Sequence, residues 1–176
     1  NWHYHTEPEA NLNGRRIYWP RGKVLGGSST INGMIYVRGN AHDYDRWAQM
    51  GLTGWSYAEV LPYFRKSERH AQRRDEFHGH RGELSVCRAR GTNELFDVFV
   101  TAGEQVGHRR NDDFNGADQN GFGRYDFTIR NGKRCSTATA FLHPAAARPN
   151  LTIVTNALTT RVLIECAYFE ARGVRR

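Results

Sequence analysis

The hydrophobic pattern predicts a helix wherever apolar residues recur at helical spacing behind a residue that can cap a helix. Asn40 can cap a helix over residues 41–50, and Gly51 stands where that helix would end. Asn93 can cap a second helix, in which apolar side chains recur at helical spacing as far as Val106. These two segments are therefore predicted helices with recognisable start signals.

Two other segments carry weaker helical signals. Ser56 and Glu59 have the spacing of a capping box, in which each residue bonds the other's backbone N–H. Pro62 follows inside the same segment, so we expect that helix to be kinked or irregular. Ser136 can cap a short helix that is broken by residues 148–150.

The clearest β signal is a hairpin. Residues 127–130 and 133–135 are β-prone runs separated by Asn131 and Gly132. Asn-Gly favours a two-residue turn in which both residues have positive φ, and this turn matches the twist of paired strands. The sequence therefore predicts two antiparallel strands joined at Asn131.

Single strands are predicted at residues 83–86, 151–155 and 160–164. Polar, glycine-containing stretches at 1–20 and 112–123 predict extended loops. The chain shows no internal repeat and no low-complexity tract.

Composition and charge narrow the class of protein. The chain has 176 residues, 39% of them hydrophobic, which is enough for one globular domain with a core. No run approaches the ~20 apolar residues needed to cross a bilayer, so no transmembrane segment is expected. The net charge is +7, but the arginines are scattered among acidic residues. This favours a solvated surface, with a contribution to an anionic cofactor as the alternative, and no nucleic-acid partner is expected.

Cysteine and histidine give no metal or disulfide signature. The three cysteines are odd in number and form no C-x-x-C pair, which favours free thiols in a reducing compartment. The pairs His3 and His5, and His78 and His80, are too few ligands for a metal. We therefore expect no metal site.

The segment 21–39 carries the strongest chemical signal. Gly26 and Gly27 remove side chains where a backbone would approach a ligand, and Ser28 can cap a following helix. Free N–H groups at such a helix start suit an anion or cofactor, although a tight structural turn is the alternative. The pattern is neither a Walker A loop nor G-x-G-x-x-G.

The same segment resembles the first signature of the glucose-methanol-choline (GMC) oxidoreductases. The similarity continues in order along nearly the whole chain, through 54–57, 61–64, 77–79, 112–116, 121–123, 136–142 and 148–151. Within the family, the chain resembles the bacterial branch of choline dehydrogenases and aliphatic alcohol dehydrogenases. This resemblance implies an α/β parent fold, with a Rossmann-type FAD-binding domain and a substrate domain on an antiparallel sheet; as a fragment, the chain itself would be α+β.

The resemblance also implies residue roles. The residues expected at the FAD are Val24, Gly27, Ser28, Asn32, Gly33, Met34, Ile35 and, as the adenine contact, Thr159. Some choline-oxidising relatives attach FAD through a His at the position of Ile31, and Ile has no nucleophilic atom, so FAD is expected to be held non-covalently. His78 fits the family's His-Gly turn and is expected to be structural.

The expected organisation is a partial FAD-binding domain at 1–68, an interdomain segment and the start of the substrate domain at 69–150, and a strand pair at 151–176. We expect an internal fragment, with G-x-G-x-x-G encoded upstream and the catalytic His downstream, so no catalytic residue is assigned here. The implied reaction oxidises a primary alcohol to an aldehyde with a non-oxygen electron acceptor.

The resemblance leaves several points open. Alone, the chain is expected to bind FAD weakly and not to oxidise alcohols. The alternative is a non-catalytic remnant or interaction module without flavin. The expected location is the cytoplasm, or peripherally at the inner membrane.

Overall fold

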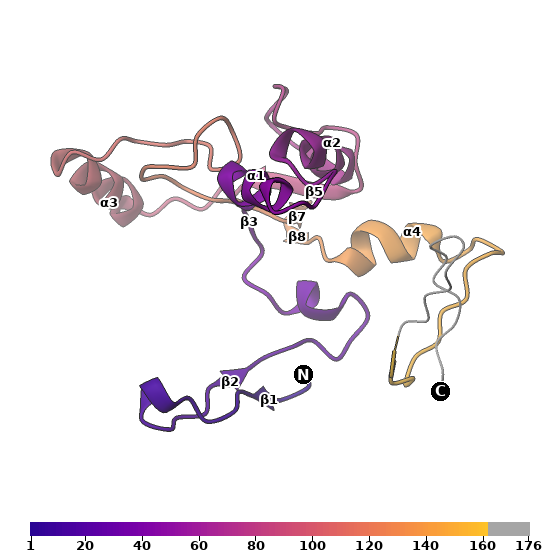
Figure 1. The fold of residues 1–176 in the computed structure, drawn as a ribbon. Helices are drawn as coiled ribbons and strands as arrows, with labels where there is room; N and C mark the ends of the chain where they lie inside the picture. Colours follow the sequence, from indigo (N-terminus) through magenta and orange to yellow (C-terminus); the bar gives the residue numbers. More distant parts are fainter. Residues whose placement is uncertain (162–176) are drawn as a thin grey trace. The chain divides into compact units, whose positions relative to one another are not determined.

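The computed structural model describes residues 1–161 (Figure 1). The contacts within the chain divide it into two units. The first unit is Asn1–Pro144, and the described part of the second is 145–161. No helix in the described part of the chain is long and apolar enough to span a membrane.

The first unit is built on a four-stranded mixed sheet with strand order β3-β6-β5-β4. Its strands are β3 (Ile35–Tyr36), β4 (Glu68–His70), β5 (Leu84–Arg88) and β6 (Asp126–Phe127). β6 pairs antiparallel with β3 and β5, and β4 runs parallel to β5. The predicted strand at 83–86 is thus confirmed as β5. The expected boundary after residue 68 falls within this sheet, because β3 comes before it in the chain and β5 and β6 come after it. The expected domain boundaries stay a prediction.

Two capped helices lie between β3 and β4. The helix α1 (Ala41–Gln49) begins behind Asn40, whose side chain accepts a hydrogen bond from the His42 N–H at 3.0 Å. The helix α2 (Tyr57–Ser67) has the predicted capping box, and it is assigned continuously through Pro62. Both sequence predictions of a helix are confirmed here because each start signal is local.

Aromatic packing holds α1 against α2. The ring of Tyr44 on α1 lies edge-on to that of Phe64 on α2, with 5.8 Å between the ring centroids. Trp47 lies 5.4 Å from Tyr44 and 5.7 Å from Trp55 by the same measure. Edge-to-face contacts of this kind add specific geometry to apolar burial, so the two helices form one layer.

The third predicted helix is confirmed as α3 (Glu94–Gln105), with the Asn93 side chain accepting from the Leu95 N–H at 2.9 Å. Only part of its apolar surface is covered in the described residues. Val100 is buried, whereas Leu95 and Phe99 are 69% and 63% exposed.

The predicted Asn-Gly hairpin is confirmed. The strands β7 (Ile129–Arg130) and β8 (Lys133–Arg134) pair antiparallel, and Asn131 and Gly132 have φ of 51° and 74°. The hairpin is followed along the chain by the π-helical turn η3 (Ala138–Leu142) and the short helix α4 (His143–Ala145).

Four expectations need correction. The region 1–20 is not only loop: β1 (Tyr4–His5) pairs with β2 (Tyr18–Trp19) around the 3₁₀ turn η1 (Ala10–Leu12). The short helix after Ser136 is a π-helical turn whose cap position is Thr137, although the Ser136 Oγ still accepts from the Thr139 N–H at 3.3 Å.

The other two corrections concern a helix and a strand. No helix follows Ser28: the chain forms a four-residue 3₁₀ turn, η2 (Gly27–Thr30), and then β3. The turn ends at Ile31, whose φ of −120° and ψ of −6° are not helical, and Met34 further on adopts a φ of 64°. Residues 151–155 form no strand, since they find no strand partner in the described residues and stay exposed. The other expected strand, 160–164, lies mostly outside the described residues.

The described interior contains more polar than apolar side chains. The buried apolar residues are Val86, Val100, Cys135, Ala138 and Ala140. The buried polar residues are Arg38, Glu68, His70, His78, Asn111, Asn115, Asp126 and Ser136. Buried polar groups are stable only when they are hydrogen-bonded or paired, so the packing of this unit depends on a polar network.

We predict that Gly132→Val lowers the free energy of unfolding by about 1–2 kcal/mol, because a β-branched residue is strained at positive φ. Asn131→Gly is the matched control and should change stability by less than about 1 kcal/mol, since Gly tolerates the same φ. Urea unfolding followed by circular dichroism measures both. A Gly132→Val chain as stable as the wild type would contradict this account of the turn.

Candidate cofactor-binding site

The glycine-rich loop is a compact turn, not a helix start. Gly26 has φ of 88°, and a Cβ there would lie 2.6 Å from Thr30 Oγ1 and 3.2 Å from Ala138 Cβ. The Thr30 hydroxyl donates to the Leu25 carbonyl at 3.0 Å, which closes the turn from inside. The fold itself therefore requires a glycine at position 26.

Gly33 differs, because nothing within the described chain requires it. A Cβ added there would meet no atom within 4 Å, and its φ lies outside the left-handed region. The residue is exposed and stands between Asn32 and Met34, whose φ is positive. Position 33 thus leaves open space next to backbone, which is what the close approach of a flat ligand needs.

A later segment of the chain fixes this loop. The Arg134 Nη1 on β8 donates to the Ser29 carbonyl at 3.2 Å and to the Asn32 Oδ1 at 2.7 Å. The Thr137 N–H donates to the Ser29 Oγ at 2.9 Å, and the Thr137 hydroxyl donates to the Gly26 carbonyl at 3.1 Å. Sequence reasoning missed both residues, because their partners lie more than 100 positions away along the chain.

Seven of the eight residues expected to contact FAD belong to this one loop and the start of β3. These seven are Val24, Gly27, Ser28, Asn32, Gly33, Met34 and Ile35. Val24 and Ile35 are about half exposed, and Leu25 and Ile31 add further exposed apolar surface. Thr159, the expected adenine contact, is exposed and belongs to the second unit, so its placement at the site stays a prediction.

The end of the loop leads through β3 into a buried ionic cluster. Arg38 follows β3, and its Nη2 donates to the Glu68 Oε2 at 2.7 Å, with both side chains buried. Asn115 fixes the same strand end: its Oδ1 accepts from the Arg38 N–H at 2.8 Å, and its Nδ2 donates to the Tyr36 carbonyl at 3.0 Å. The loop is thereby tied to the start of β4.

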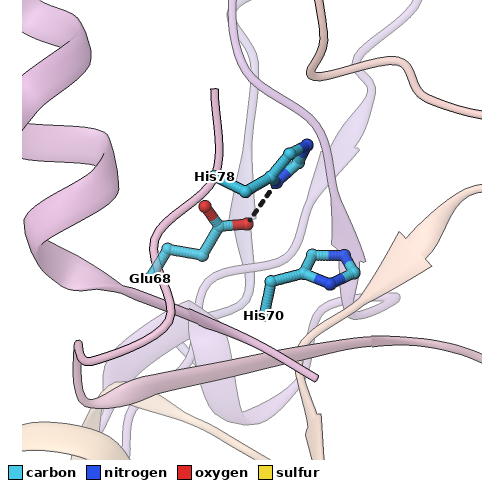
Figure 2. Close-up of side chains that lie close together, drawn as sticks. All are labelled: Glu68, His70 and His78. Atoms are coloured by element: carbon cyan, nitrogen blue, oxygen red, sulfur yellow. Dashed lines mark hydrogen bonds and ion pairs between the residues drawn. The ribbon is translucent and has the colours of Figure 1, made fainter. Parts of the chain in front are cut away.

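Glu68 also faces His78 (Figure 2). The His78 Nδ1 lies 3.0 Å from the Glu68 Oε1, and its Nε2 lies 2.9 Å from the Asp113 Oδ2. Since a carboxylate only accepts hydrogen bonds, both ring nitrogens are donors and the ring is an imidazolium. Burial alone would lower the pKa of His78, but the hydrogen bonds to Asp113 and Glu68 outweigh burial and raise it to about 9.

His70 lies beside His78 but is held differently. Its Nδ1 accepts from the N–H groups of Gln72 and Arg73, so its Nε2 carries the proton and donates to the Asp126 Oδ2 at 3.2 Å. Burial opposes ionisation of Asp126, but the hydrogen bonds from His70 and Arg88 outweigh burial and hold its pKa at about 2. The two neighbouring histidines therefore differ in their hydrogen bonds, because His78 faces a carboxylate at each ring nitrogen and His70 at only one.

These hydrogen bonds argue against a metal in the cluster. Glu68, His70 and His78 lie close enough together to share an ion, as do Asp75, His78 and Asp113. A histidine ligand needs a free ring lone pair. His78 has none, and the single lone pair of His70 accepts two backbone N–H groups. In the described residues these side chains form a buried network of hydrogen bonds and ion pairs, and the expectation of no metal site stays a prediction.

The cysteines in the described residues are free. Cys87 is half-buried and Cys135 is buried, and neither forms a disulfide. Burial raises the pKa of the Cys87 thiol, with a further contribution from Asp126, so it is a poor nucleophile at neutral pH. Cys166 lies outside the described residues.

The loop is therefore a glycine-rich turn bordered by exposed apolar side chains. The family model described as GMC oxidoreductase matches residues 8–176. The chain belongs to the GMC oxidoreductase family.

Curated relatives are similar over most of the chain. Choline dehydrogenase, mitochondrial, of Mus musculus is 48% identical over 165 residues, which are 94% of this chain and 28% of that protein. Oxygen-dependent choline dehydrogenase of Rhizobium johnstonii is 52% identical over 165 residues, 94% of this chain and 30% of that protein. The chain thus spans under a third of the length of these relatives.

Solved structures share the fold. Pyridoxine 4-oxidase from Mesorbium loti has a TM-score of 0.85 at 34% identity, covering 93% of this chain and 33% of that one. An FAD-dependent oxidoreductase from Chaetomium thermophilum has a TM-score of 0.84 at 26% identity, covering 92% and 30%. These neighbours support the expected mixed α and β fold class.

We predict that Glu68→Gln destabilises the chain by about 3–5 kcal/mol, because Arg38 and His78 would keep buried charges without their shared counter-ion. Glu83→Gln is the matched control: Glu83 pairs with Arg69 at 3.8 Å on the surface, so its loss should cost only about 0–1 kcal/mol. Urea unfolding compares the variants, and equal effects would contradict the structural importance of the cluster.

Stability should fall as pH rises above neutrality. The pKa of His78 is about 9 in the folded chain against 6.5 as its ordinary value, so only the folded state keeps the proton between these values. The free energy of unfolding should drop by about 1.4 kcal/mol per pH unit from pH 6.5 to 9.

His78→Gln should remove this slope, while His80→Gln, at the exposed neighbouring histidine, should keep it. Urea unfolding at several pH values tests the point. Wild-type stability that is flat or rises across this window would show that His78 is not held as a cation.

Proposed function

We propose that this chain supplies part of the flavin site of an FAD-dependent oxidoreductase that oxidises choline or another primary alcohol to the aldehyde. The support is its membership of the GMC family and its similarity to proteins named choline dehydrogenase. The single observation on which the site assignment depends is the open space at Gly33, which the fold does not need.

The residues on the loop fit the parts of FAD. The half-exposed Val24 and Ile35 offer apolar surface to a flat ring system and would exclude water from it. Gly33 allows the ring to approach backbone closely. When bound, FAD supplies the hydride acceptor for alcohol oxidation.

The histidines of the structure do not supply a base at this loop. His70 and His78 are buried and hydrogen-bonded through both ring nitrogens. The other six histidines are exposed, and the proposal assigns none of them to proton transfer. The 176-residue chain alone should therefore not turn over alcohol, because base catalysis is worth typically ~10²–10⁴-fold in rate. It should also bind FAD weakly, because its sequence contains no G-x-G-x-x-G turn to hold the ADP half.

The electron acceptor belongs to the same proposal. We assign an acceptor other than oxygen, and the names of the relatives differ on this point, since the Rhizobium johnstonii protein is named oxygen-dependent. The assay uses the parent enzyme that contains this chain. If it reduces a dye with choline in the absence of oxygen, the assignment is supported; if its choline oxidation requires oxygen uptake, the assignment is contradicted. The proposal also places the protein in the cytoplasm, or peripherally at the inner membrane, which cell fractionation tests.

A chimera tests the site. The 165 aligned residues of the Rhizobium johnstonii choline dehydrogenase are replaced by those of this chain, and the product is called the choline dehydrogenase chimera. We predict that it purifies with FAD, that choline bleaches the flavin anaerobically, and that acid denaturation releases the flavin because Ile31 cannot bond it. A folded, colourless chimera would contradict the proposal and favour a remnant or interaction module.

Gly33→Val in this chimera should weaken FAD binding at least about tenfold, because the branched side chain fills the space that the ring needs. Gly91→Val is the matched control, since Gly91 also has an ordinary φ and open space around its Cβ position. Flavin fluorescence during FAD titration measures both variants. Unchanged affinity in Gly33→Val would remove Gly33 from the site.

A further inference from the structure

The glycine-rich cofactor loop, residues 26–34, forms hydrogen bonds with one short segment much later in the chain. This segment consists of Arg134, at the end of β8, and Thr137, just before η3. Both reach the loop through hydrogen bonds, and both follow the Asn-Gly turn closely. The turn therefore determines where these two side chains lie relative to the loop.

Arg134 bonds two points of the loop with one nitrogen. Its Nη1 donates to the Ser29 carbonyl at 3.2 Å and to the Asn32 Oδ1 at 2.7 Å. The same Asn32 Oδ1 accepts from the Met34 N–H at 3.0 Å, at the residue with positive φ. Arg134 thus stabilises the bend that presents Gly33, and hydrogen bonds from a charged donor are among the stronger ones.

Thr137 closes the other side of the turn. Its hydroxyl donates to the Gly26 carbonyl at 3.1 Å and lies 3.0 Å from the Ser29 Oγ. Its N–H donates to the Ser29 Oγ at 2.9 Å, and Ser29 in turn donates to the Gly26 carbonyl. Ser29 and Thr137 thus both donate to the carbonyl of Gly26, and these hydrogen bonds join two distant segments at the glycine that the fold requires.

We propose that Arg134 and Thr137 are positioning residues for FAD: together they clamp residues 26–34 in the shape that leaves Gly33 open. The clamp rests on the proposed function for its ligand but not for its geometry. Neither side chain needs to touch the cofactor. Their contribution is to reduce the conformational freedom that the loop would otherwise lose on binding.

Hydrogen exchange of the 176-residue chain tests the geometry without any cofactor. Thr137→Val removes the hydroxyl but keeps the shape of the side chain, and amide exchange in 24–34 should rise about threefold to tenfold. Thr137→Ser should restore the wild-type rate. Arg134→Met should raise exchange in the same peptides by at least about tenfold, while Arg130→Met, an exposed arginine on the facing strand, should not.

FAD affinity of the choline dehydrogenase chimera tests the positioning role. Arg134→Met and Thr137→Val should weaken FAD binding in the same order as they loosen the loop, and Thr137→Ser should rescue it. Exchange that rises over α1 and α2 equally would show general destabilisation and overturn the clamp.

The two proposals fail in different ways. Unchanged exchange in 24–34 would overturn the clamp even if FAD binds. Loosened exchange with unchanged FAD affinity would overturn the positioning role. A wild-type chimera without FAD would instead overturn the proposed function, and the exchange data would still decide whether the clamp exists.

Discussion

The structure depends on the pairing of one buried carboxylate with positively charged side chains. Glu68 stands at the junction of α2 and β4 and is fully buried, which is costly for a charge unless cations pair with it. Arg38 and His78 supply those cations, and the Gly79 N–H adds a hydrogen bond at 2.8 Å. Because Arg38 lies two residues after the end of β3, the carboxylate also fixes the strand into which the cofactor loop leads.

The loop is consequently held at both ends by polar groups, and apolar packing has a smaller part. One end is tied through Arg38 and Asn115, the other through Arg134 and Thr137. Such networks determine geometry more sharply than apolar contacts do, because a misplaced donor leaves a buried group unsatisfied. The apolar residues of the loop remain exposed and free to contact a ligand.

Local signals predicted local structure well. The caps at Asn40, Ser56 and Asn93 and the turn at Asn131 lie within a few residues of the elements they start, so sequence alone located these elements. The glycines and the family resemblance pointed to the segment 24–35, whose contact with FAD stays a prediction, and the helix expected after Ser28 is a 3₁₀ turn. Contacts across 100 positions leave no periodic trace, so Arg134 was missed, and the strand predicted at 151–155 has no partner in the described residues.

The central claim is that residues 24–35 form the flavin contact, and photolabelling tests it most directly. An azido-FAD analogue bound to the choline dehydrogenase chimera is irradiated, and the labelled peptides are mapped by mass spectrometry. The account predicts adducts within residues 24–35 that excess FAD suppresses. FAD-suppressible adducts in this chain that lie only outside that segment, for example on α3, would contradict it.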